Sequence, residues 1–495
     1  MNFSLRKTSI FFLIGLLHSI SCFSQTTIPV GQPISSALTD ERNPYISGDG
    51  KTLIFEQLSR MSDRPELLIS FMESGGWTRP EAIPSANMDI VGLINGGYSL
   101  NFDGTRLYFH SARKGGLGGS DIWYMDRTST GNTWTAPQNI IKPINTTAHE
   151  TYPNISPYGD ILFYTVFTSE KTANGNPCGK IMMAKKKGKD NWEAGMELPS
   201  SINSGCSCNG KLLPDGKTFV FSSQRSDSKG GYDLYTSTWD GKQTWSTPTP
   251  IDLLNTSVDN LSFSIPSATN LVYTDALDKS GKGFDVVRVM LPASFQPENT
   301  VLWTATTQYN VAETAGIQVL LKNISENEEY TLYYTTKQTI ILPLKTNINY
   351  VLYIQSMKKG FTYDCIEVYA SSMSEKIPAT SILLTSLKPG VAIKTSTLQT
   401  EEETPSASYD YDVKQLAFFL KYNSDVKLQL TDYYIPPVID TTAIDSTIIA
   451  TTPVEPSATI LYKLYQELLA NGIDGTRLIY RREESDKEAY SIKVQ

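Results

Sequence analysis

Short runs of alternating apolar and polar residues recur along the first 290 residues, and tight turns separate them. The clearest unit is SLNFDGTRLYFHSARKGGLGGSDIWYM, residues 99–125. It predicts a strand, an Asp-Gly turn, a second strand, a glycine-rich loop and a third strand, because alternation places the apolar residues on one face of a sheet. A phosphate-binding loop would open a helix. Strand-forming residues follow GGLGG at once, so we interpret it as a turn.

The same unit returns at a nearly constant spacing. Its turn glycines lie 54, 55 and 57 residues apart, at Gly50, Gly104, Gly159 and Gly216, and a worn fifth copy starts at Pro266. Tryptophans recur 57, 58 and 53 residues apart, at Trp77, Trp134, Trp192 and Trp245. A period of this length with several short strands per unit is typical of a β-propeller. We expect five blades, with the tryptophans packed between neighbours.

These repeats resemble the TolB-like (WD40-like) propeller repeat over roughly residues 27–292, most specifically in the second and fourth units. The fifth unit ends after its third strand, near Met290. We therefore expect residues near Thr27–Val30 to supply its missing outer strand, which closes the ring and hides two sheet edges. The recurring aspartates of GGSDIW, GGYDLY and KGFDVV are expected to bind turn backbone in each blade. They are Asp121, Asp233 and Asp285.

After Pro292 the repeat stops, and short alternating strands continue without a helical stretch. This pattern predicts a small β-sandwich over residues 296–376. The segments AGIQVLLKN and TIILPLKTNINYVLYIQSMKKGF resemble the regulatory-type sandwich appended to carboxypeptidases. An unrelated sandwich is the alternative.

Residues 377–495 change pattern again. Val413, Leu416, Ala417 and Leu420 form one helical stripe, and Leu461, Leu464 and Leu468 form another. We expect Ser457 to cap the second helix and Asn471-Gly472 to end it. With strands before, between and after the helices, the order indicates an α+β unit. A Pro/Thr-rich stretch, about residues 433–456, is expected to be a loop insertion.

This unit resembles the OmpA-like peptidoglycan-binding domain through QLAFFLKYNSDVKLQLTD and PSATILYKLYQELLANGIDGTRLIY. In that family an Asp and an Arg clamp the carboxylate of the peptidoglycan stem peptide. The Asp position corresponds to Asp432, but Ile460 stands at the Arg position. A branched alkyl side chain cannot make the bidentate bond that a carboxylate requires. We expect the scaffold to be kept and the clamp to be lost.

The N-terminus predicts export. Arg6 and Lys7 precede a short apolar stretch, TSIFFLIGLLHSIS, typical of a signal peptide over residues 1–24. Cleavage after Ser24 competes with lipidation of Cys22; Ser19 stands where a lipobox requires Leu, which favours simple cleavage. No later segment is long and apolar enough to cross a bilayer. The net charge of −8 does not indicate the positively charged surface that nucleic-acid-binding proteins carry.

Four cysteines follow the leader, and an exported chain permits a disulfide. Cys178 falls in the loop before the third strand of the third blade, whereas Cys206 and Cys208 fall at the crossing into the fourth blade. Those connections emerge on one face of a propeller, so we predict a disulfide from Cys178 to Cys206 or Cys208; three free buried thiols are the alternative. With only three histidines we expect no metal site and no cofactor.

The order of propeller (residues 25–295), sandwich and OmpA-like domain resembles periplasmic propeller–OmpA proteins of Bacteroidota, some of which serve type IX secretion and gliding. The resemblance implies a non-enzymatic scaffold in the periplasm or at the outer membrane, with cell-envelope proteins as partners. The alternative is a module that binds a glycan or peptide on the propeller. A hydrolase has little support, because no Gly-x-Ser-x-Gly elbow occurs and His110 at a strand end favours a packing or surface role.

Overall fold

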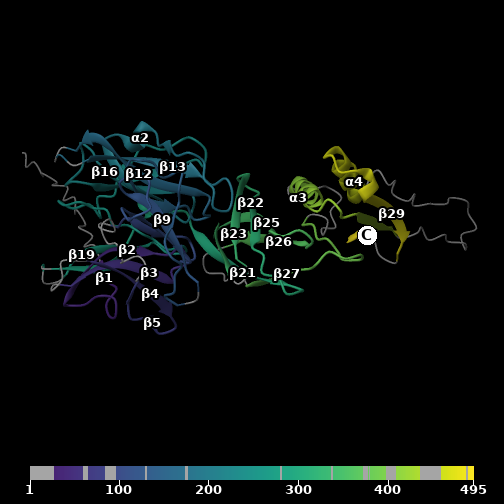
Figure 1. Ribbon diagram of the computed structural model, residues 1–495, viewed down its shortest axis with the longest axis horizontal. Coiled ribbons are helices and arrows are strands. Elements are labelled where there is room, and N and C mark those ends of the chain that lie inside the picture. The colour runs from purple at the N-terminus through teal and green to yellow at the C-terminus, as the bar shows by residue number, and fades with distance from the viewer. Residues whose placement is uncertain are drawn as a thin grey trace, which may run out of the picture.

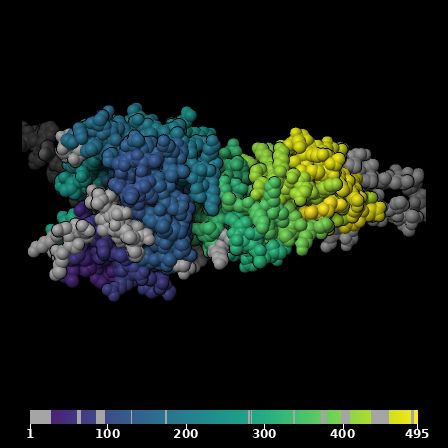
Figure 2. Space-filling model, in the orientation of Figure 1, coloured from purple at the N-terminus to yellow at the C-terminus, as the bar shows by residue number. Residues whose placement is uncertain are grey.

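The computed structural model describes residues 27–59, 65–83, 96–128, 131–172, 175, 177–278, 281, 283–335, 338–371, 377, 379–396, 409–434, 459–485 and 489–495. The expected leader with Cys22, the capping residue Ser457 and most of the expected loop insertion lie outside these residues. The chain is mainly β, as predicted, and its parts follow one another along an elongated body (Figures 1 and 2). The propeller strands lie at one end, β21–β27 in the middle, and α3, α4 and β29 at the other end.

Five antiparallel sheets form between residues 27 and 290 of the described chain. The first contains β2 (Thr39–Ile46), β3 (Thr52–Ser59), β4 (Glu66–Glu73), β5 (Gly76–Trp77) and β6 (Glu81–Ala82). The second contains β7 (Tyr98–Leu100), β8 (Arg106–Ser111), β9 (Asp121–Asp126) and β10 (Gln138–Asn139). The third contains β11 (Glu150–Ile155), β12 (Ile161–Lys171), β13 (Pro177–Lys185) and β14 (Met196–Glu197), followed by the short helix α2 (Ser200–Asn203). The fourth contains β15 (Cys206–Leu212), β16 (Thr218–Gln224), β17 (Asp233–Thr238) and β18 (Thr249–Pro250).

The fifth sheet joins the two ends of the repeat region. It contains β19 (Leu271–Leu277), β20 (Phe284–Met290) and β1 (Thr27–Pro29), and β1 pairs antiparallel with β20 so that Thr27 lies opposite Val289. The predicted closure by the N-terminal strand is confirmed. Because β1 covers the outer edge of β20, that strand is paired on both sides, and the short strand β1 forms the outer edge of the sheet.

Neighbouring sheets share hydrophobic cores, and each repeated tryptophan contributes to one of them. Trp134 packs against the core that joins the first and second sheets, and Trp192 against the next core. Trp245 stacks on Trp239 at 5.4 Å between ring centroids and contacts the core of the third and fourth sheets. Trp77 packs where the fifth sheet meets the first. The expectation that the tryptophans pack between blades is confirmed.

Two sheets follow the propeller and form the sandwich. The first has the order β24 (Ile340–Lys345), β21 (Thr300–Tyr309), β27 (Thr380–Leu384). The second has the order β23 (Glu328–Tyr334), β22 (Ile317–Asn323), β25 (Ile348–Ser356), β26 (Tyr363–Ala370). The 3-10 helix η1 (Ala293–Phe295) precedes them. Strand β27 pairs parallel with β21, so this sheet extends past residue 376, where we expected the sandwich to end. A five-residue strand after a break in the pattern gave too little periodicity to assign.

The last unit contains α3 (Tyr409–Tyr422), β28 (Leu428–Tyr434), α4 (Ile460–Ala470), the 3-10 helix η4 (Gly475–Arg477), β29 (Leu478–Glu484) and β30 (Ala489–Val494). Its sheet has the order β29–β28–β30, with β29 parallel to β28. Helix α4 begins at Ile460 with Thr459 as its N-cap, one position before the helix and not at the expected Ser457. Its end is as predicted, with Asn471 as C-cap and Gly472 at φ +81°.

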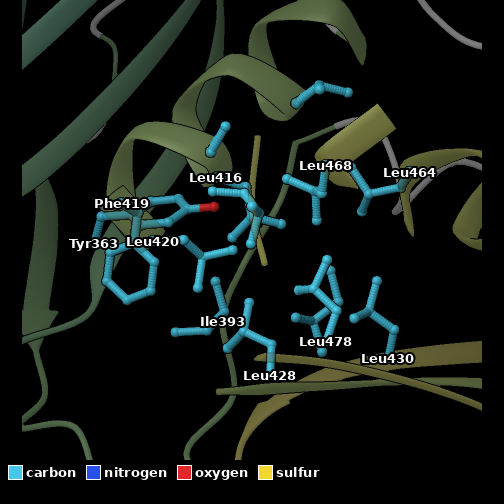
Figure 3. Packing of buried hydrophobic residues seen from close by; sticks show 14 of the residues in the cluster. Tyr363, Ile393, Leu416, Phe419, Leu420, Leu428, Leu430, Leu464, Leu468 and Leu478 are labelled. Carbon is cyan, nitrogen blue, oxygen red and sulfur yellow. The ribbon is translucent and has the colours of Figure 1, made fainter. Parts of the chain in front are cut away.

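The sandwich and the α+β unit share one continuous hydrophobic core (Figure 3). Tyr353 and Tyr363 of the sandwich pack with Phe419 and Leu420 of α3, and the same core continues to Leu464 of α4 and the sheet. The buried Asp412 of α3 accepts a hydrogen bond from the Tyr353 hydroxyl at 2.9 Å. Breaking such a junction would expose apolar surface and strand a buried carboxylate, so the two parts are held as one body.

Candidate functional site

The propeller axis is surrounded by irregular inner strands. Asn43, Tyr152 and Asn209 adopt φ values of 51°, 47° and 51°, and each stands at a register shift between the first and second strands of its sheet. In the second sheet a glycine, Gly97, stands at the equivalent position, and the residue before it, Gly96, has φ 75°. A bulge turns one side chain out of the alternating pattern. The bulges therefore direct polar groups of the inner strands toward the neighbouring sheets.

Polar contacts cross every boundary between adjacent sheets at this belt. They are Tyr98 OH to Asn43 O (2.8 Å), Tyr152 N to His110 Nδ1 (3.3 Å), Asn154 Nδ2 to Asn209 Oδ1 (3.0 Å), Asn209 Nδ2 to Leu261 O (2.7 Å) and Ser264 Oγ to Pro44 O (3.1 Å). These hydrogen bonds pair buried polar groups of neighbouring sheets and so fix the relative position of the sheets. We call these residues the axial belt.

Glu56 contributes the carboxylate of the axial belt. It is 7 % exposed and accepts hydrogen bonds from Asn43 Nδ2 at 3.1 Å and from Gly96 N at 2.9 Å. Burial, and after it the negative charge of Glu56, raises the pKa of Tyr98 well above its usual value. A buried acid of this kind was not visible in the sequence, because it stands in a strand with no motif around it.

His110 lies in the same belt and has a structural environment. Its Nδ1 accepts the Tyr152 N–H, so the ring is neutral with the proton on Nε2, and burial lowers its pKa to about 4. The ring fills the space that a side chain at Gly97 would need, since a Cβ there would lie 1.8 Å from His110 Cε1. The expected packing role agrees with these contacts.

A small cavity of about 40 Å³ lies next to the axial belt, on the side of the turn glycines, between the inner strands of the sheets. Lys211 is the charged side chain in its lining and is 8 % exposed. Its Nζ donates to Phe263 O at 2.7 Å and lies 4.9 Å from the centroid of the Tyr45 ring. Burial lowers the pKa of Lys211 to about 7.

Two of the three recurring aspartates, Asp121 and Asp233, bind turn backbone as expected. Asp121 accepts hydrogen bonds from Leu117 N at 2.6 Å and from Gly118 N at 3.3 Å. Asp233 accepts one from Lys229 N at 2.6 Å. Both carboxylates accept hydrogen bonds from the glycine-rich turns that precede their strands. These bonds support a structural role for the aspartates over a catalytic one.

The structure links Cys178 to Cys206, with 4.8 Å between their Cα atoms, and leaves Cys208 as a free buried thiol. The free Cys365 is half-buried. Both disulfide residues line a surface groove of about 430 Å³ beside α2. Lys180 crosses this groove, 3.9 Å from Glu170, so the groove is polar and mixed in charge.

The third-sheet disulfide has counterparts in the neighbouring sheets. At the equivalent junction after the second sheet, Ser120 N donates to His149 Nδ1 at 3.2 Å. After the fourth sheet, Tyr232 N donates to Asp259 Oδ1 at 2.9 Å. The start of each third strand is thus tied to the start of the next inner strand by a different chemical group. The sequence did not reveal this, because the three groups share no residue type.

The two clamp positions of the C-terminal unit lie near one another. Asp432 accepts a hydrogen bond from Tyr480 OH at 2.9 Å, and that hydroxyl lies 3.4 Å from Thr459 Oγ1, directly before Ile460. A cation is also present, since Arg482 Nε lies 4.0 Å from Asp432 Oδ2. Sequence comparison missed Arg482, because it stands on β29 and not at the helix start.

None of the helices in the described residues is both long and apolar enough to cross a membrane. Across the same parts of the chain, no group of three or more His, Cys, Asp or Glu side chains is arranged to hold a metal ion.

No family model and no curated protein matches this sequence. Among solved structures, a putative TolB from Agrobacterium tumefaciens is 14% identical with a TM-score of 0.30, over 60% of this chain and 90% of that one. TolB from Acinetobacter baumannii is 17% identical with a TM-score of 0.31, and the match spans 52% of this chain and 56% of that one. An α-L-arabinofuranosidase from Podospora anserina is 12% identical with a TM-score of 0.34, over 53% and 94% of the two chains. These values assign neither a family nor an activity.

Proposed function

We propose that the protein is a non-enzymatic scaffold of the cell envelope, which holds a propeller face at a fixed distance from a C-terminal docking unit. In this proposal residues 1–24 are a leader that is removed, and the mature chain acts in the periplasm or at the outer membrane. Residues 25–295 are the propeller, and the sandwich and OmpA-like unit follow, divided after β27 (Thr380–Leu384). Envelope proteins, among them components of a secretion or motility machine, are the partners.

The observation that carries the proposal is the tight junction at both ends of the sandwich. On the propeller side the hydroxyl of Tyr158 donates to Pro343 O at 2.9 Å, and the Tyr158 ring lies 4.1 Å from that of Tyr330. Glu326 binds both Lys217 of the propeller and Lys345 of the sandwich, and these ammonium groups lower its pKa to about 2 despite the opposing effect of burial. On the other side lies the shared core of Figure 3. A rigid rod suits a spacer between two partners.

The Asp-Gly turns of the propeller face the sandwich, since Gln338 Nε2 donates to Asp103 Oδ2 at 2.7 Å. The loops at the opposite end of the strands are therefore open to a partner. They carry exposed apolar side chains, including Leu117 and Val258, at 44 % and 60 % exposure. Because the propeller and the sandwich connect these loops to the C-terminal unit, a partner bound to the loops would be held at a fixed distance from that unit. This is the role of a scaffold.

Site-specific photo-crosslinking in intact cells tests this function. A crosslinking residue replaces Leu117 or Val258 on the open face, and a matched control replaces Leu383 on the sandwich, which is 55 % exposed. We expect the same envelope proteins to be captured from both face positions and not from the control. Equal capture from all three positions, or capture of oligosaccharide without protein, would contradict the scaffold.

We further propose that the C-terminal unit does not hold a peptidoglycan stem peptide in the usual way. Ile460 offers no donor, and Asp432 already accepts a bond from Tyr480. Co-sedimentation of the full-length protein with purified sacculi is expected to show weak retention, unchanged in Asp432→Ala. Strong retention that Asp432→Ala abolishes would show that a clamp survives, with Arg482 as its cation.

The alternative function is a binding module for a glycan or peptide, and the axial belt is the observation that favours it. Neutral amides and a carboxylate gathered on a propeller axis are groups that bind hydroxyls and peptide bonds. Equilibrium binding to an array of envelope oligosaccharides and peptides tests it. Saturable binding that is lost in Asn209→Ala, with the fold retained, would favour this module over the scaffold.

A further inference from the structure

The cavity next to the axial belt is built by the inner strands of all the propeller sheets. Its lining is mostly apolar, and each sheet contributes to it an aliphatic side chain, namely Ile46, Leu100, Ile155, Leu212 and Ile265. A volume of about 40 Å³ corresponds to roughly three water-sized sites. The cavity is thus suited to a molecule of three or four heavy atoms, and Lys211 is the charged residue in its lining.

The surroundings of Lys211 favour an amine over an ammonium ion. Within the described residues its nitrogen has one hydrogen-bond acceptor, Phe263 O, and forms no salt bridge. The Tyr45 ring, whose centroid lies 4.9 Å from the nitrogen, attracts a cation but does not replace an anion. An ammonium ion has three N–H groups and a full charge to satisfy, and burying it without an anion is costly. A neutral amine needs less, and it keeps a lone pair that can attack a carbonyl carbon.

We propose that the Lys211 amine is a carbonyl-reactive site that takes up a small aldehyde of two or three carbons from the axial cavity. The nitrogen lone pair attacks the carbonyl carbon and forms a C–N bond while the carbonyl electrons move to oxygen. The two amine protons and that oxygen then leave as one water molecule, and an imine remains. Desolvated lysines are activated as nucleophiles for this chemistry.

The protonation state supports the geometry. Burial lowers the pKa of Lys211 to about 7, so that about half of the amine is neutral at pH 7. Tyr45 of the first inner strand is the titratable neighbour that faces it, and burial raises the pKa of that phenol, so it stays uncharged. The second, third and fifth sheets line the cavity with groups that do not titrate, such as Leu100, Ile155 and Ser264.

Reductive alkylation of the full-length protein tests the proposal. Acetaldehyde at limiting concentration and pH 7 is the probe, and cyanoborohydride supplies the hydride that converts the imine to a stable ethylamine. Peptide mass mapping then gives a rate for each lysine. We expect Lys211 to react at least about tenfold faster than the exposed Lys51. The neutral fraction of an ordinary lysine at this pH is about a thousandfold smaller, and the buried position and lower basicity of Lys211 offset only part of that difference. In urea the two rates should become equal.

Two controls keep the result decisive. Benzaldehyde is too large for the cavity, so it should label Lys51 and spare Lys211. In Lys211→Met the fast phase of acetaldehyde labelling should disappear while the other sites keep their rates. Labelling of native Lys211 at or below the rate of Lys51, or equal labelling of Lys211 by both aldehydes, would overturn the proposal. These comparisons within the wild-type protein stand even if the variant does not fold.

Discussion

The third and fourth propeller sheets solve one structural problem with different chemistry. Both have four antiparallel strands, and they share a hydrophobic core. The fourth sheet keeps the glycine-rich loop before its third strand and ties that loop to the next sheet through Asp259, which accepts Tyr232 N–H. The third sheet has lost this loop and uses the covalent link between Cys178 and Cys206. The comparison shows that the junction is preserved although the residues that make it are not.

The largest expected effect comes from removing the covalent junction. Replacing Cys178 and Cys206 together by Ser should lower the free energy of unfolding by about 3–4 kcal/mol, because the 28-residue loop no longer restricts the unfolded chain. Urea denaturation of the oxidised proteins measures the change. The matched control is Cys208→Ser, which leaves the link intact. A loss below about 1 kcal/mol would show that the link is not needed where the glycine-rich loop is missing.

A second prediction sharpens what the two sheets share. Asn203 receives Ile181 N–H at 2.9 Å and donates to Ile181 O, and Asn255 does the same with Leu234. Both side chains are buried. Replacing either by Ala strands backbone groups of the third strand, which should cost about 2–3 kcal/mol in each sheet.

Thermal and urea unfolding of the two Ala variants, side by side, check this equality. A much smaller loss of unfolding free energy in the third sheet would mean that the disulfide, and not Asn203, stabilises the junction there. Asn145 makes the same bonds to Ile122 in the second sheet and provides a third measurement of the same kind.

The inner strands of the two sheets differ at the position of Lys211, which gives a pH prediction. Lys211 follows the bulge at Asn209 by two residues, and Asn154 follows the bulge at Tyr152 by the same distance. Since burial lowers the folded pKa of Lys211 from its usual value near 10.5 to about 7, the folded state favours the neutral amine. The folded protein therefore has its full stability above pH 10.5, and the free energy of unfolding decreases as the pH falls from 10.5 towards 7.

Lys211→Met should therefore be more stable than wild type at pH 7 by about 2 kcal/mol, because the pKa shift corresponds to about 4–5 kcal/mol and the unpaired Phe263 carbonyl offsets part of this gain. The advantage should shrink as the pH rises to 10.5. Urea denaturation across this range measures it. Asn154→Leu, in the equivalent place of the third sheet, should show no pH-dependent difference. A constant advantage of Lys211→Met at all pH values would mean that the gain comes from packing alone.

The sequence predicted the parts of the fold that depend on repetition. The turn glycines, the tryptophans between sheets and the closing strand Thr27–Pro29 all followed from period and alternation. The strand Thr380–Leu384 was missed, because its place is set by pairing with a distant strand and not by its own pattern. The capping residue was misplaced for a related reason, since Ser457 and Thr459 are both good N-caps and tertiary packing decides between them.

The site was less predictable than the fold. Asn43 reaches Glu56, and Asn209 reaches Asn154 of the neighbouring sheet, from positions where the strands bulge. No local pattern marks a bulge at Tyr152. Arg482 reaches Asp432 from a parallel neighbouring strand, a contact that depends on register. The cysteines were placed correctly on one face by the order of strands, but choosing Cys206 over Cys208 required coordinates.

The smallest expected effect concerns the non-covalent junction of the fourth sheet. In Asp259→Ala the N–H of Tyr232 loses its acceptor, but water reaches this exposed loop and replaces it. The free energy of unfolding should therefore fall by only about 1 kcal/mol, a typical net value for one hydrogen bond. Asp259→Asn keeps an acceptor oxygen and should recover most of the loss. If Asp259→Ala cost as much as losing the disulfide, solvent would not reach the loop, and the two junctions would be equal in strength as well as in place.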